Sequence, residues 1–157
     1  MSDARFQDGG EAPLRLVARD GEDLKVISAL VQDAVLPVTG LKFDARHRRF
    51  ALMLNRFRWE DRDEAERLGR AYERVRSVMV VEDVRKVQSM GFDRAESDLV
   101  LSLLSMEFAP GEDGTGRLVL TLAGDGAVAL DVEALEVRLD DVTRPYRAPS
   151  GKAPHHD

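Results

Sequence analysis

The segment from Asn55 to Glu60 carries the residue types best able to bind a ligand or a partner. It places Asn55, Arg56, Arg58 and Glu60 around Trp59, the single tryptophan of the chain. Arginine binds carboxylate or phosphate through paired hydrogen bonds, and tryptophan stacks on rings and guanidinium groups. Both residue types are also enriched at the centres of protein interfaces. These five residues are therefore the candidate binding site, either for a protein partner or for a small anionic ligand.

The plainest interpretation of this segment is an amphipathic strand end, with Trp59 covering the core and the arginines in water. A third alternative is nucleic-acid binding through the basic hairpin 46–58. Strand alternation disperses its charge, however, because Arg49 points away from the side taken by the even-numbered arginines. The net charge of −6 also opposes general attraction to nucleic acid. We therefore place nucleic-acid binding below the other two alternatives.

Residues that carry catalysis or hold metals are sparse. The chain has no cysteine and three histidines, of which two stand at positions 155 and 156, and His47 lies among arginines that would repel a cation. The glycines at 111, 114 and 116 come with two acids and no Lys-Ser/Thr pair, which does not suit a phosphate loop. The acidic pair Asp140–Asp141 is typical of a solvated strand end. We expect no catalytic residue, no metal and no cofactor, and we favour a non-enzymatic function.

One substantial helix is predicted near the N-terminus. Asp20 is a suitable N-cap, and apolar residues follow at spacings of three and four from Leu24 to Val35. Pro37 would end the helix. The apolar stripe predicts that the helix packs against a sheet.

From residue 41 onward, apolar residues mostly alternate, which predicts strands. Leu41–Asp44 and Arg49–Phe57 form a hairpin in which Phe50, Leu52 and Leu54 point the same way. Gly124-Asp125-Gly126 marks another hairpin turn. Residues 60–69 predict a solvated loop or a short exposed helix, and 135–139 a third meander strand or a short helix. Further strands are expected at 14–17, 74–81, 83–90, 99–108, 118–122 and 128–132. The predicted fold class is α+β, a mostly antiparallel sheet of about nine strands with one main amphipathic helix.

The length of 157 residues suits a single domain. We expect a flexible segment at 1–12, a single α+β domain at 13–146 and a disordered tail at 147–157. The lack of a long apolar run or an apolar leader favours a cytoplasmic protein with no membrane contact. Residues 1–80 hold 15 Lys/Arg and 14 Asp/Glu, whereas residues 81–157 hold 8 and 15. This asymmetry could bring the two halves together, or favour a homodimer or another protein partner.

Several segments resemble an uncharacterised alphaproteobacterial family, domain of unknown function 2948. They are 50–61, with its Asn-Arg-Phe-Arg-Trp-Glu run, 73–77, 99–104 and 139–142. The resemblance covers roughly residues 13–146 and implies a small bacterial cytoplasmic protein. It supplies no activity, cofactor or catalytic residue. The leading hypothesis is a protein-interaction or accessory protein, in which Trp59→Ala or Arg58→Ala disrupts a complex and spares the fold.

Overall fold

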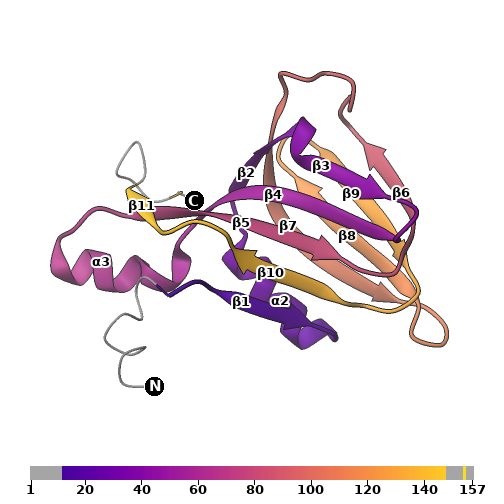
Figure 1. Ribbon diagram of the computed structural model, residues 1–157, viewed down its shortest axis with the longest axis horizontal. Helices are drawn as coiled ribbons and strands as arrows, with labels where there is room; N and C mark the ends of the chain where they lie inside the picture. The colour runs from indigo at the N-terminus through magenta and orange to yellow at the C-terminus, as the bar shows by residue number, and fades with distance from the viewer. Residues whose placement is uncertain (1–11, 148–153, 155–157) are drawn as a thin grey trace.

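The computed structural model describes residues 12–147 and residue 154. Within them, eleven strands form one sheet, joined by two α-helices and two short 3-10 turns (Figure 1). No helix in this part of the chain is long and apolar enough to cross a membrane. The strands are β1 Arg15–Ala18, β2 Ala34–Pro37, β3 Leu41–Asp44, β4 Arg49–Phe57, β5 Glu73–Val81, β6 Val84–Met90, β7 Val100–Pro110, β8 Gly116–Leu122, β9 Gly126–Val132, β10 Val137–Asp141 and β11 Tyr146–Arg147; the helices are α2 Gly21–Leu30 and α3 Arg62–Leu68, and the 3-10 turns are η1 Val38–Gly40 and η2 Trp59–Asp61.

Every strand pair in the sheet is antiparallel, and the order is β1-β10-β5-β4-β2-β7-β8-β9-β6, with β11 beside β5 and β3 beside β4. The sheet curls over, so that β4, β5, β10 and β1 run in front of β7, β8 and β9 in Figure 1. Alternate side chains from both parts fill the space between them. Phe50, Leu52, Met79, Leu120 and Leu139 are buried in this core. Helix α2 packs against β1 and β7.

The local signals predicted from sequence hold in several places. The backbone N–H of Asp23 donates to Asp20 Oδ1 at 2.8 Å, so Asp20 caps helix α2. Strands β3 and β4 pair over the predicted hairpin, from Leu41 opposite Leu52 to Asp44 opposite Arg49. Of the two alternatives for 60–69, the short helix is confirmed, as turn η2 followed by α3. The α+β class with a mostly antiparallel sheet is confirmed.

The predicted helix is too long. Helix α2 ends at Leu30, and Ala34–Pro37 form strand β2. Asp33 has φ 65°, and its N–H donates to the carbonyl of Leu103, which turns the chain into the sheet. Residues 34–36 satisfy the spacing of a helix and the alternation of a strand alike. Pairing with β7 on one side and β4 on the other satisfies the backbone of β2, and this decides the outcome.

The predicted third meander strand pairs elsewhere. Strand β10 forms, but it lies between β5 and β1, while β9 pairs with β8 and β6. The structure also has eleven strands where about nine were expected, because β2 and the short β11 join the sheet. Most of the terminal segments 1–12 and 147–157 lies outside the described residues.

Candidate functional site

The directions of Asn55 and Arg56 follow from their parity in β4, whereas Arg58, Trp59 and Glu60 lie beyond its end. The even-numbered Phe50, Leu52 and Leu54 face the core. Because strand side chains alternate, Arg56 faces the same interior, and its exposure is 0%. Asn55 points to the opposite, outer face. The candidate residues therefore do not share one surface.

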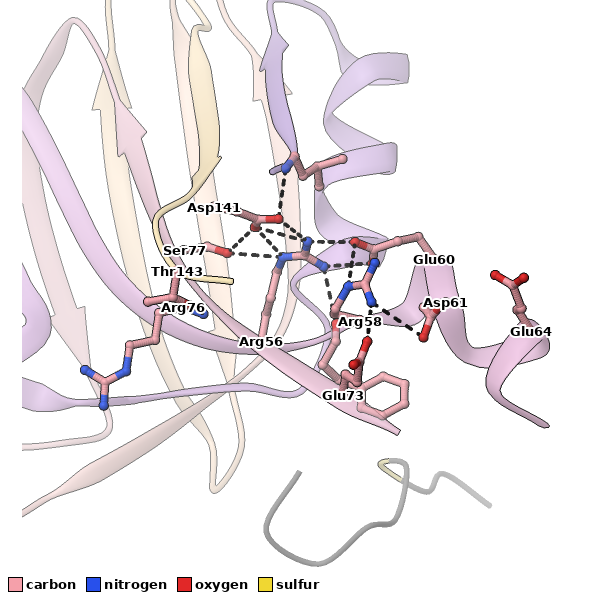
Figure 2. Close-up of polar contacts among 12 residues, drawn as sticks. Arg56, Arg58, Glu60, Asp61, Glu64, Glu73, Arg76, Ser77, Asp141 and Thr143 are labelled. Carbon is pink, nitrogen blue, oxygen red and sulfur yellow. Dashed lines mark hydrogen bonds and ion pairs between the residues drawn. The ribbon is translucent and has the colours of Figure 1, made fainter. Parts of the chain in front are cut away.

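Arg56 lies at the end of the core between two carboxylates (Figure 2). Its Nη1 and Nη2 donate to Glu60 Oε1 at 2.9 Å and Oε2 at 2.8 Å, a bidentate ion pair. Its Nε and Nη2 also donate to Asp141 Oδ1 at 3.2 and 3.1 Å. The hydroxyl of Ser77 donates to Asp141 Oδ1 at 2.7 Å, and the backbone N–H of Leu14 donates to Asp141 Oδ2 at 2.9 Å. The guanidinium thus ties β4 to β10, β5 and turn η2, and Asp141 extends the contact to the segment before β1.

Arg58 begins a second group of ion pairs. Its Nη1 donates to Glu73 Oε1 and lies 3.5 Å from Asp61 Oδ2. Arg70 donates to both oxygens of Asp61 at 2.7 Å. Asp61 is 4% exposed at its side chain and Arg58 is 5% exposed, so both charges are held away from water. Together the two groups bring three arginines within reach of four carboxylates, and we call them the buried ion-pair network.

The contacts of the network shift the pKa values of Arg56, Glu60 and Asp61. Burial opposes the charge of Arg56, but hydrogen bonding and attraction from Glu60 and Asp141 outweigh it and raise the pKa of Arg56. Burial likewise works against ionised Glu60, yet the bond from Arg56 leaves the pKa of Glu60 below its usual value. The hydrogen bonds from Arg70 lower the pKa of Asp61. Arg56, Glu60 and Asp61 are therefore ionised at neutral pH.

Trp59 links turn η2 to helix α2. Its Nε1 donates to the carbonyl of Gln32 at 2.9 Å, just beyond the end of α2. The indole meets Phe57 edge-on, with ring centroids 4.8 Å apart, and the guanidinium carbon of Arg62 lies 5.6 Å from the indole centroid. Trp59 is half-buried, and its polar atom is used within the chain.

Asn55 lies in a hollow of the outer face. Its Nδ2 donates to Tyr146 Oη at 2.6 Å, whereas its buried Oδ1 accepts no hydrogen bond from the described residues. The hollow measures about 320 Å³ and is lined by Val35, Leu36, Pro37, Met53, Leu54, Asn55, Arg76 and Val100. It opens where β4 changes partner, because β2 pairs with β4 at Val35–Asn55 alone and β3 takes over from Leu52.

A family model described as "Protein of unknown function (DUF2948)" matches residues 14–156. The chain belongs to this family. No curated protein and no solved structure shows significant similarity to the chain. The DUF2948 match spans the whole sheet, including the buried ion-pair network and the hollow beside Asn55.

Three of the five candidate residues of this DUF2948 domain come together: Arg56, Arg58 and Glu60. Trp59 lies beside them and donates a hydrogen bond to Gln32, just beyond the end of α2, and Asn55 lies on the other face of the sheet. The guanidinium groups of Arg56 and Arg58 already contact carboxylates, so an anion would have to displace Glu60, Asp141 or Glu73 to reach them. This geometry indicates that Arg56, Arg58 and Glu60 act as a structural clamp at the end of the sheet and do not form a ligand site.

Sequence reasoning missed the partners of this clamp, above all Ser77 and Asp141. A signal for both was present, because Ser77 shares strand parity with buried Met79, and Asp141 shares it with buried Leu139. A polar residue on the inward parity of a strand needs a partner inside the fold. Asp61, Arg70 and Glu73 carried no comparable signal.

Four of the five arginines of the basic hairpin 46–58 make ion pairs within the chain, and Arg46 makes none with the described residues. Arg48 pairs with Glu133 at 2.6 Å, and Arg49 pairs with Glu82 at 2.9 Å. His47 contacts Asp44 at 2.7 Å within the turn. Among the described residues, no three acidic or histidine side chains are grouped so as to hold a metal ion.

Proposed function

We propose that this chain is a non-enzymatic cytoplasmic interaction protein, an accessory subunit that binds a protein partner on the outer face of its sheet. The contact is centred on the hollow beside Asn55. In this proposal the buried ion-pair network keeps the sheet in shape, and the exposed side of β4 makes the contact.

The single observation that carries the proposal is the composition of the hollow. Met53 is 46% exposed and Val100 is 65% exposed at its rim, and both are large apolar side chains. Inside it, Asn55 Oδ1 is an acceptor with no donor among the described residues. This atom is buried below the surface of the hollow, so the exposed apolar rim is the part that a partner can contact. The apolar rim suits a protein side chain.

The test is a capture experiment with a tagged chain in the cytosol of its native cell, with and without nuclease. We compare the wild type with Met53→Glu and with the matched control Met90→Glu. Met90 is 48% exposed, a fraction similar to that of Met53, but it lies on edge strand β6. A stoichiometric protein retained by the wild type and by Met90→Glu, lost from Met53→Glu and insensitive to nuclease supports the proposal.

Equal capture by wild type and Met53→Glu would contradict the proposed surface. A partner that disappears with nuclease would instead favour nucleic-acid binding. Melting temperatures of both variants show whether the sheet remains intact, and we expect a small change for each because both side chains point to solvent.

A further inference from the structure

The strand register extends the hollow into a wider surface. Outward residues of neighbouring strands form three rows across β3, β4, β5, β10 and β1, continued by β2. We call these rows the outer face; they are Lys42–Ala51–Val80–Arg138–Val17, Met53–Val78–Asp140–Arg15 and Val35–Asn55–Arg76. In Figure 1 these strands cross the front of the view, and neither described helix lies over them.

The cations of the outer face are not neutralised within the fold. Arg15, Lys42, Arg76 and Arg138 are exposed, and none makes an ion pair with the described residues. Figure 2 shows the Arg76 side chain directed away from the buried ion-pair network. The three rows contain one carboxylate, Asp140, although the whole chain has a net charge of −6. The face is thus a local excess of positive charge on an acidic protein.

Two exposed cations of other parts of the sheet are paired within the fold. Arg49, at the end of β4, is held by Glu82 at 2.9 Å, and Arg117 on β8 by Asp131 at 2.9 Å. Between the free cations of the outer face lie Ala51, Val78, Val80 and Met53, with Val100 at the far side of the hollow. Charged and apolar side chains are thus interspersed over this surface.

We propose that the outer face binds an acidic protein segment in which carboxylates alternate with apolar side chains. This inference rests on the proposed function and names the chemistry of its partner. Carboxylates of the segment meet the free cations, and its apolar side chains cover Val78, Val80 and Met53. An extended segment suits the surface because strand side chains alternate with the same period as the rows.

Two other occupants fit less well. A second copy docked face to face about a two-fold axis would place Lys42, Arg76 and Arg138 against the same cations. Proteins bind single-stranded nucleic acid partly by stacking its bases on aromatic side chains, and the three rows contain no aromatic ring.

The test measures fluorescence anisotropy of short labelled peptides with the purified full chain. The probe peptide alternates Glu or Asp with Val or Leu; one comparison peptide has lysine for each acid, and another has serine for each apolar residue. We expect the acidic–apolar probe to bind, both comparison peptides to bind at least about tenfold more weakly, and the affinity of the probe to fall with added salt.

A charge-reversal triple variant, K42E/R76E/R138E, should weaken probe binding by at least about tenfold. The matched control, R46E/K86E/R94E, reverses three exposed residues that also make no ion pair with the described residues, and should bind as the wild type does. Equal loss in both triples, or equal binding of the lysine peptide, would overturn the inference.

Tighter binding of a mixed-sequence single-stranded RNA than of the acidic probe would also overturn it. So would a dimer in sedimentation that Met53→Glu dissociates, since a second copy would then occupy the face. If the capture experiment succeeds and the peptides show no charge preference, the inference fails and the proposed function stands. If Met53→Glu leaves capture unchanged, the proposed surface itself fails.

Discussion

Arg56 and Asp141 are 85 residues apart in the sequence and meet at the end of the core, where Arg56 Nη2 lies 3.1 Å from both oxygens of Asp141. Each belongs to a strand whose other inward residues are apolar. The contact therefore takes the place of hydrophobic packing at this end of the sheet. A buried pair of this kind is strongly interdependent, since removal of either partner leaves an uncompensated charge.

Arg56→Ala should lower the free energy of unfolding by about 3–5 kcal/mol, because Asp141 and Glu60 lose the charge that compensates them. Urea denaturation measures the change. Arg76→Ala, on the neighbouring strand and directed to solvent, is the control, with an expected change within about 0.5 kcal/mol. Equal effects of the two substitutions would show that the network does not stabilise the fold.

The same reasoning alters the hypothesis for Arg58. An exposed Arg58 could be truncated without harm to the fold, but the side chain is 5% exposed and contacts Glu73 and Asp61. We expect Arg58→Ala to be destabilising, so it cannot serve as a clean probe of partner binding. Met53→Glu is the better probe.

Stability should fall on acidification. The pKa values of Glu60 and Asp61 are lower in the folded chain than their ordinary values of 4.5 and 3.8, so protons bind the unfolded chain more tightly. The stabilisation from these groups is complete above about pH 5 and is lost as pH drops through the ordinary values toward the lowered folded ones.

Denaturant midpoints measured across this pH window test the assignment. Asp61→Asn should flatten the pH dependence relative to the wild type, because one of the depressed carboxylates is gone. Asp63→Asn, whose side chain is 90% exposed, is the control and should leave the slope unchanged. An identical slope in all three proteins would mean that Asp61 does not couple protonation to folding.

Trp59→Phe should cost about 0.5–1.5 kcal/mol, because it removes the hydrogen bond from Nε1 to the carbonyl of Gln32 and retains an aromatic ring beside Phe57. Amide hydrogen exchange should rise at the C-terminal end of helix α2. Tyr72→Phe, which removes an exposed hydroxyl bonded to Glu66, should leave exchange in α2 unchanged. No change in α2 on loss of the indole would rule out its role as a link.

The amino-acid sequence by itself determined the local elements of this protein. The Asp20 cap, the β3–β4 hairpin and the turn around Gly124 follow from side-chain chemistry within a few residues. Strand alternation also determined the inward direction of Arg56, because the parity of Phe50, Leu52 and Leu54 continues through it. Strand alternation did not predict which residues surround the Arg56 side chain in the interior.

Only the tertiary structure decided which elements become neighbours. It placed β10 beside β5 instead of β9, ended helix α2 at Leu30, and brought Ser77 and Asp141 to Arg56. These outcomes depend on backbone pairing and charge compensation between residues far apart in the chain. The free energies of such contacts are set by burial and by distance in space, which the order of residues along the chain does not encode locally.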